Sequence, residues 1–153
     1  MYLTYEEHLE RVKHYGFALY NVPDEHKTPK ICLAAVTQEG LALLYVPQDL
    51  KTPELCLVAV KQDGWAIEEV PENLKTQKLY LSMVQQNGYN LAFIPDNKLT
   101  EEICLAAVKQ KVWVFYYVPQ NLKTPEICLI AIQQDHKMIR ASPYTVLELM
   151  ALS

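Results

Sequence analysis

Residues 46–60 read VPQDLKTPELCLVAV and residues 118–132 read VPQNLKTPEICLIAI, so nearly the same stretch occurs twice in the chain. The second copy begins 72 residues after the first, which is three times a shorter repeat length of 24 residues. Prolines keep a 24-residue step at Pro23, Pro47, Pro71, Pro95, Pro119 and Pro143, and threonines keep it at Thr4, Thr28, Thr52, Thr76, Thr100 and Thr124. Such a fixed period over the whole chain indicates a protein built from stacked structural repeats.

The first half of each repeat predicts an α-helix. Thr52 is a favourable N-cap residue, and Pro53 suits the first position of a helix. Residues 55–60 are all apolar, which a helix flanked by neighbours on several sides tolerates. Glycines recur at Gly16, Gly40, Gly64 and Gly88, and we expect each to end its helix in the left-handed conformation.

The second half of each repeat predicts a shorter helix. Residues 65–70 are WAIEEV, and Pro71 disfavours helical geometry at Val70. The segment is therefore limited to about two turns of α-helix or 3₁₀-helix. A polar turn then leads to the next N-cap.

A single repeat has too few apolar side chains to offset the entropy lost on ordering its backbone. Stability must come from repeat-to-repeat interfaces, so we predict an all-α fold, a right-handed α-solenoid of about six repeats. We predict a single domain over residues 1–153, with an N-terminal cap repeat (1–23), core repeats (24–141) and a C-terminal capping helix (142–153). The cap helix after Thr4 keeps only Leu9 and Val12 of the central apolar stripe.

The repeated pattern V-P-x-x-L-K-T-P-E-[IL]-C-L-x-A-[VI]-x-Q resembles a family of short helical repeats from host-associated bacteria, catalogued as a domain of unknown function. By its 24-residue period the chain is also similar to leucine-rich-variant repeats, which alternate an α-helix with a 3₁₀-helix. The first resemblance implies a scaffold used in effector-like or modular proteins. Neither resemblance implies a catalytic residue.

Composition narrows the classes of function. The net charge is −4, and residues 1–76 carry 7 basic against 12 acidic side chains. Nucleic-acid binding usually relies on a basic surface, so this balance argues against it. No apolar run reaches the length of about 20 residues that a membrane span needs. The N-terminus lacks the features of a secretory signal peptide, so we expect a cytoplasmic protein, or one delivered into another cell by a signal that the sequence does not display.

The four cysteines are candidate metal ligands. Along the chain, each cysteine of the set Cys32, Cys56, Cys104 and Cys128 follows the one before it by one or two whole repeat periods. Metal-binding motifs instead place their cysteines within a single turn or loop. We interpret them as core residues, with a metal site or a redox role as the alternatives. We also find no histidine pair, Gly-rich loop or serine elbow with catalytic spacing. We therefore expect no enzyme activity, no metal and no cofactor.

Aromatic residues give the candidate contact surface. Trp65, Tyr89 and Trp113 occupy the same position of successive repeats, and Val112 stands where the glycine is expected. We expect that Val112 removes the helix stop, and that this repeat has diverged toward binding. The candidate partner-binding residues are Trp65, Tyr89, Lys109, Lys111, Trp113, Tyr116 and Tyr117. Packing between the short helices is the alternative explanation for these rings.

These observations predict a non-catalytic protein that binds a partner protein through a face of the solenoid, as an inhibitor, adaptor or effector module. The alternative is a helical-repeat protein that binds nucleic acid, because helical repeats can read single strands one base at a time. Membrane association is not expected.

Overall fold

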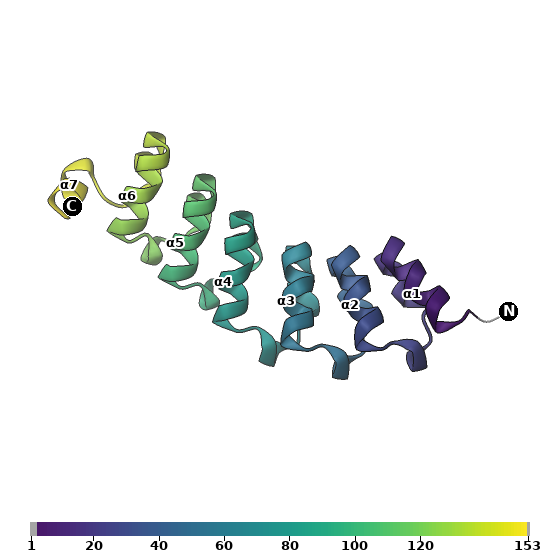
Figure 1. Ribbon diagram of the computed structural model, residues 1–153. Coiled ribbons are helices and arrows are strands. Elements are labelled where there is room, and N and C mark those ends of the chain that lie inside the picture. The colour runs from purple at the N-terminus through teal and green to yellow at the C-terminus, as the bar shows by residue number, and fades with distance from the viewer. Residues whose placement is uncertain (1–2, 153) are drawn as a thin grey trace. The chain divides into compact units, whose positions relative to one another are not determined.

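The computed structural model describes residues 3–152, which form α-helices alternating with 3₁₀-helices and contain no strand in that range (Figure 1). This arrangement confirms the predicted all-α repeat fold. The α-helices are α1 (Tyr5–His14), α2 (Pro29–Gln38), α3 (Pro53–Gln62), α4 (Gln77–Gln86), α5 (Glu101–Gln110), α6 (Pro125–Gln134) and α7 (Val146–Leu152).

Threonine side chains start the α-helices as the sequence predicts. The Thr28 hydroxyl accepts a hydrogen bond from the Ile31 N–H at the start of α2, and Thr4, Thr52, Thr100 and Thr124 cap α1, α3, α5 and α6 in the same way. In α1 the Glu7 side chain also accepts from the Thr4 N–H, which completes a capping box. The repeated threonine therefore satisfies one of the free N–H groups at each of these helix starts.

The second element of every repeat is a six-residue 3₁₀-helix. The sequence allowed either an α-helix or a 3₁₀-helix here, and the structure shows the 3₁₀ type. These helices are η1 (Gly16–Asn21), η3 (Gly40–Tyr45), η5 (Gly64–Glu69), η7 (Gly88–Phe93), η9 (Val112–Tyr117) and η11 (His136–Ala141). The turns contain shorter 3₁₀-helices, η2 (Asp24–His26), η4 (Gln48–Leu50), η6 (Glu72–Leu74), η8 (Asp96–Lys98) and η10 (Gln120–Leu122).

The expected role of the glycines is wrong. None of the four glycines has a positive φ, so none ends its helix in the left-handed conformation. The α-helix ends instead at an extended residue before the glycine, such as Tyr15 with φ −147°. The glycine is needed because the next repeat approaches closely: a Cβ on Gly16 would lie 2.5 Å from the carbonyl oxygen of Ala35. Its missing side chain, rather than its conformational freedom, explains its recurrence.

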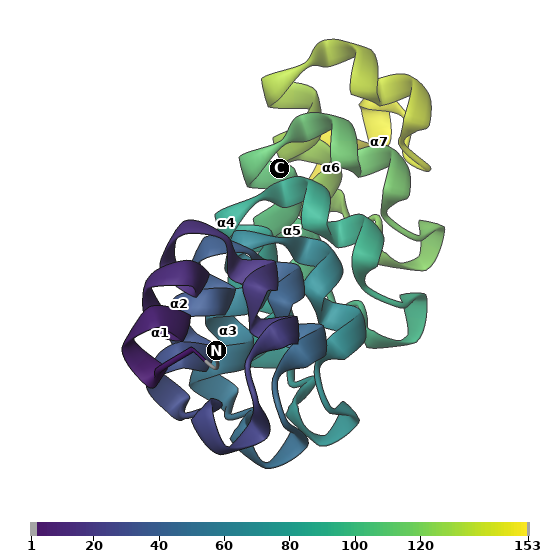
Figure 2. The ribbon, with the colours of Figure 1, turned by 90° about the vertical axis from the view of Figure 1, so that its right-hand side faces the viewer.

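The chain divides into two compact units, the first ending at Leu79 and the second beginning at Tyr80, within the first turn of α4. In the first unit, α2 contacts both α1 and α3, and η3 contacts both η1 and η5. Within this unit, α1, α2 and α3 lie side by side in one layer, and η1, η3 and η5 form a second layer (Figures 1 and 2). Helices α2 and α3 also pack on the 3₁₀-helix of the preceding repeat. The predicted boundaries between caps and core repeats stay a prediction.

The second unit repeats this scheme. Helix α5 packs against α6, and η9 contacts both η7 and η11. Helix α7 packs on α6 but begins at Val146, four residues into the segment 142–153 that was predicted as the capping helix. The delay arises because Ser142 accepts a hydrogen bond from the Tyr144 N–H in a turn, and Thr145 then caps the helix by accepting from the Glu148 N–H.

The core of each unit lies between its two layers. Ala35 and Ala59 are fully buried in the first unit, and Val108 and Phe115 are fully buried in the second. No helix among residues 3–152 has the length and apolar character needed to span a membrane.

Candidate functional site

The most prominent aromatic surface of the second unit lies on η9. Trp113 is 50% exposed, Tyr116 53% and Tyr117 62%, whereas Val114 and Phe115 between them are fully buried. Residues three apart lie on the same side of a 3₁₀-helix, so Trp113 and Tyr116 are neighbours. Their rings are nearly parallel, with an interplanar angle of 13° and centroids 6.2 Å apart. This stacked pair orders two large rings at the surface.

The structure places the other candidate contact residues as follows. Tyr89 is exposed on η7, which contacts η9. Lys109 in the last turn of α5 and Lys111 before η9 are both exposed. Six of the seven candidate residues thus belong to the second unit. Trp65 is exposed on η5, in the first unit.

The expectation that Val112 removes the helix stop is wrong. Helix α5 ends at Gln110 like its counterparts, and the Lys111 N–H donates to the Ala107 carbonyl over 2.9 Å. The substitution acts on packing instead. Helix α6 packs less closely on η9 than α5 does on η7, which begins with a glycine. A side chain at this position keeps the next helix farther away, because the glycine otherwise receives a backbone carbonyl.

A buried lysine, Lys123, contacts the inner side of η9, the helix that carries the aromatic surface. Lys123 is 5% exposed, and its Nζ lies 4.7 Å from the centre of the Phe115 ring on η9. The same Nζ donates to the Ala141 carbonyl at the end of η11 over 3.2 Å. Burial lowers the pKa of this ammonium group. Lys123 therefore joins η9 to η11 through one cation.

The equivalent lysine of the first unit makes the same bond. Lys51 Nζ donates to the Glu69 carbonyl at the end of η5 over 2.8 Å. Sequence reasoning missed this contact, although the lysine recurs before the capping threonine at Lys27, Lys51, Lys75 and Lys123. The recurrence is the signal that could have revealed it.

The cysteines are core residues, as expected. All four are fully buried as free thiols, and Tyr80 fills their position in α4. Burial raises the pKa of Cys32 and of Cys104 to about 11, and it raises the pKa of Cys56 and Cys128 as well. A thiol with a raised pKa is a poor nucleophile at neutral pH. Residues 3–152 contain no group of three or more acidic, histidine or cysteine side chains placed to hold a metal ion.

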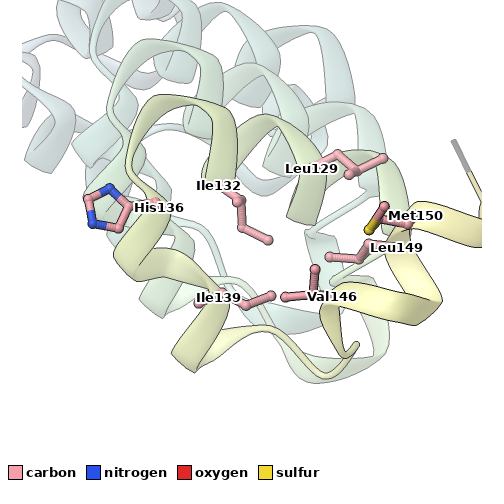
Figure 3. Close-up of a pocket in the computed structure, with 7 residues that line it drawn as sticks. All are labelled: Leu129, Ile132, His136, Ile139, Val146, Leu149 and Met150. Atoms are coloured by element: carbon pink, nitrogen blue, oxygen red, sulfur yellow. The ribbon is translucent and has the colours of Figure 1, made fainter.

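An apolar pocket of about 390 Å³ lies between α6, η11 and α7 (Figure 3). Val146, Leu149 and Met150 of α7 line one side of it. Leu129 and Ile132 of α6, with His136 and Ile139 of η11, line the other. His136 occupies the position that glycine holds in the first four repeats, so a helix cannot approach η11 as α5 approaches η7. Helix α7 thus covers the last repeat incompletely. His136 at the glycine position is the feature of the sequence that could have indicated this pocket.

A family model described as "Domain of unknown function (DUF4116)" matches this chain in five overlapping segments, residues 8–51, 29–75, 52–99, 76–123 and 100–144. The chain belongs to this family. Each DUF4116 match covers about two repeats, and each successive match begins about one repeat further along the chain, as the structural repeat requires. The segments extend from α1 to just beyond η11, so this DUF4116 chain is repeat sequence over nearly its whole length. No curated protein and no solved structure matches the chain.

Proposed function

We propose that this DUF4116 protein is a non-catalytic helical-repeat protein that binds a partner protein through the aromatic surface of its second unit. The surface consists of Trp113, Tyr116 and Tyr117 on η9, with Tyr89 on η7. Lys109 and Lys111 flank it. The partner's own side chains would cover the exposed faces of the rings.

One observation carries the proposal: Trp113 and Tyr116 are stacked on each other while each leaves about half of its surface exposed. Exposing large rings to water is unfavourable, and a folded domain gains no stability from the exposed half. Tryptophan and tyrosine also dominate the binding energy of protein interfaces. Because stacking restricts both side chains before binding, less conformational entropy would be lost when a partner orders them.

The framework supports a scaffold role. The backbone of the η9 repeat keeps the helix lengths of the other repeats, so the aromatic side chains are not needed to complete its secondary structure. A short repeat protein of this kind acts by occlusion or by bridging, and we propose the role of inhibitor, adaptor or effector module. We propose the cytoplasm, of the producing cell or of a second cell that receives the protein, as the place of action.

The test is capture of a partner by wild-type protein and by a Trp113→Ala/Tyr116→Ala variant, in extract of the cells that produce the protein. A matched control variant, Tyr15→Ala/Tyr20→Ala, removes two exposed aromatic side chains of the first unit instead. We expect the wild type and the control to retain a common set of proteins that the η9 variant loses, while all three keep their thermal stability within a few degrees.

Two outcomes would contradict the proposal. The η9 variant could retain the same proteins as the wild type, which would leave the surface without a binding role. Alternatively, the η9 variant could lose stability while capture by its folded fraction is unchanged, which would assign the rings to packing.

A further inference from the structure

The basic side chains around the aromatic surface are exposed and free of ion pairs within the described chain. They are Lys109, Lys111, Lys137 and Arg140, and none of them forms an ion pair with another of the residues 3–152. Lys137 and Arg140 are on η11, which contacts η9. We call these four residues the basic group. Exposed cations beside exposed rings are the two components of a site for an anionic, partly apolar ligand.

Three of the six acidic side chains of the second unit lie at the N-terminal ends of α5 and α6, opposite to the ends that carry the basic group. Glu101 and Glu102 are in the first turn of α5, and Glu126 is in the first turn of α6. The basic group belongs to the C-terminal turns of the same helices and the segments after them, about 12 Å away along the helix axis. Asp135 is the acidic residue nearest to Lys137 in the sequence. Its carboxylate accepts a hydrogen bond from the backbone N–H of Lys137, not from the side-chain ammonium group.

The same segments of the first unit carry the opposite charge. Residues 13–23, 37–47 and 61–71 hold two basic and four acidic side chains, whereas residues 85–95, 109–119 and 133–143 hold four basic and one acidic. Glu68 of η5 corresponds to Tyr116 of η9 and to Arg140 of η11. Lys13 and Lys61 of the first unit occupy the position of Lys109. No basic residue of the first unit occupies the positions of Lys111, Lys137 and Arg140, so these three distinguish the second unit.

We infer that the partner presents an acidic, extended polypeptide segment that carries aromatic or proline side chains. This inference rests on the proposed function and names the chemistry of the partner. Carboxylates of the segment accept hydrogen bonds from Lys111, Lys137 and Arg140, and its apolar side chains cover Trp113 and Tyr116. The charge complementarity sets the orientation of the segment, and the rings provide most of the buried area.

A single-stranded nucleic acid has related chemistry, but the structure favours the peptide. Bases bind by stacking on free ring faces, and the stacking of Trp113 on Tyr116 leaves each ring one such face instead of two. The chain as a whole carries a net charge of −4, which opposes a long polyanion more than a short acidic segment.

The experiment uses the full chain to select binders from a random library of short peptides displayed on phage. The consensus peptide is then synthesised with a fluorophore, and its affinity is measured by fluorescence anisotropy. The variants are Lys111→Glu/Arg140→Glu, Trp113→Ala/Tyr116→Ala, and Lys78→Glu as a control that reverses one exposed charge of the first unit. Circular dichroism checks that each variant is folded, and fluorescein-labelled oligo(dT) is the nucleic-acid probe.

We expect consensus peptides rich in Asp and Glu with at least one aromatic residue or proline. The charge-reversal variant should bind the consensus peptide with an affinity lower by about tenfold or more, because it places like charges opposite one another. The aromatic variant should also lose binding, and the Lys78→Glu variant should stay within about twofold of the wild type.

The outcomes separate the two proposals. Neutral or basic consensus peptides, or acidic peptides that the charge-reversal variant binds as well as the wild type, would overturn the inference while the aromatic surface remains the binding site. Tighter binding of oligo(dT) than of any peptide would also overturn it. Peptides that the aromatic variant binds unchanged, or the absence of any enriched peptide, would contradict the proposed function itself.

Discussion

Gly88 faces the carbonyl oxygen of Ala107 so closely that a Cβ built on the glycine would come within 2.7 Å of that oxygen. Gly88 opens η7, and Ala107 is a fully buried residue of α5 in the next repeat. The contact therefore joins consecutive repeats through their backbones. It explains why α5 can pack tightly on η7, and why a side chain at the same position in the next repeat, Val112, loosens the packing of α6 on η9.

Gly88→Ala should destabilise the protein by about 1–3 kcal/mol, the usual cost of forcing extra volume into a packed interior. The clash is with backbone, which cannot move aside as a flexible side chain does. Equilibrium unfolding in urea measures the change. The control is Val112→Ala at the equivalent position, where a Cβ is already accommodated and a smaller effect is expected. A Gly88→Ala variant as stable as the wild type would disprove the packing role.

The four cysteines should resist modification in the folded protein. Burial raises their thiol pKa values, to about 11 for Cys32 and Cys104, and only the thiolate reacts. At mildly alkaline pH we expect very slow reaction with an aromatic disulfide reagent in buffer and rapid reaction of four thiols in guanidinium chloride. Fast modification of any cysteine in the native protein would show that its helix is not packed as described.

The N-terminal cap should weaken on acidification. His8 is buried in α1, its ring centroid is 5.6 Å from that of His26, and Tyr5 also packs edge-on against His26. Burial first, and then the His26 and Arg11 charges, lower the pKa of His8, while Glu7 opposes the shift. Among residues 3–152, His26 Nδ1 is a buried atom with no hydrogen-bond partner.

Because the folded state resists protonating His8, the unfolded state binds more protons below about pH 6.5. Stability is then fully present above that pH and falls as the pH is lowered toward the reduced pKa of the folded state. Urea midpoints measured on either side of that pH report this loss. His8→Leu should reduce the difference between the two midpoints, and His14→Leu, at an exposed position, is the control. Equal pH dependence in all three proteins would contradict the account.

Lys123 should be essential to the packing of η9 on η11. Replacing it with methionine keeps most of its volume but removes the donor to the Ala141 carbonyl and the cation beside Phe115. We expect a loss of about 1–3 kcal/mol, since the carbonyl is left without that donor. Lys78→Met at an exposed position should change stability by less than about 0.5 kcal/mol. Thermal unfolding of the two variants side by side would show whether the buried lysine differs from the exposed one.

The repeated residues predicted the elements well, because each acts locally. Thr52 caps α3 and Pro53 begins it as expected, since capping depends on the few residues around the cap. The 24-residue period and the burial of Cys56 also follow from the pattern alone. The sequence could not show what the glycines contact, because Gly40 and Ala59 belong to consecutive repeats and meet only when those repeats stack.

The candidate site was predictable in part. Trp113 was identified because its repeat departs from the others, but its stacking on Tyr116 depends on the type of helix that η9 forms, which the sequence left open between α and 3₁₀. Lys137 and Arg140 were missed because their importance comes from η11 contacting η9 and from the distant placement of the acidic residues.

The most direct test of the proposed function uses Trp113 as its own reporter. Trp65→Phe leaves Trp113 as the single tryptophan of the chain. Its quenching by acrylamide is measured with and without a partner captured by the wild-type protein, at concentrations where complex formation is confirmed by gel filtration. We predict that acrylamide quenches the half-exposed indole readily in the free protein. In the complex, the quenching constant should fall by about threefold or more. Unchanged quenching of Trp113 in a fully formed complex would show that the partner binds elsewhere.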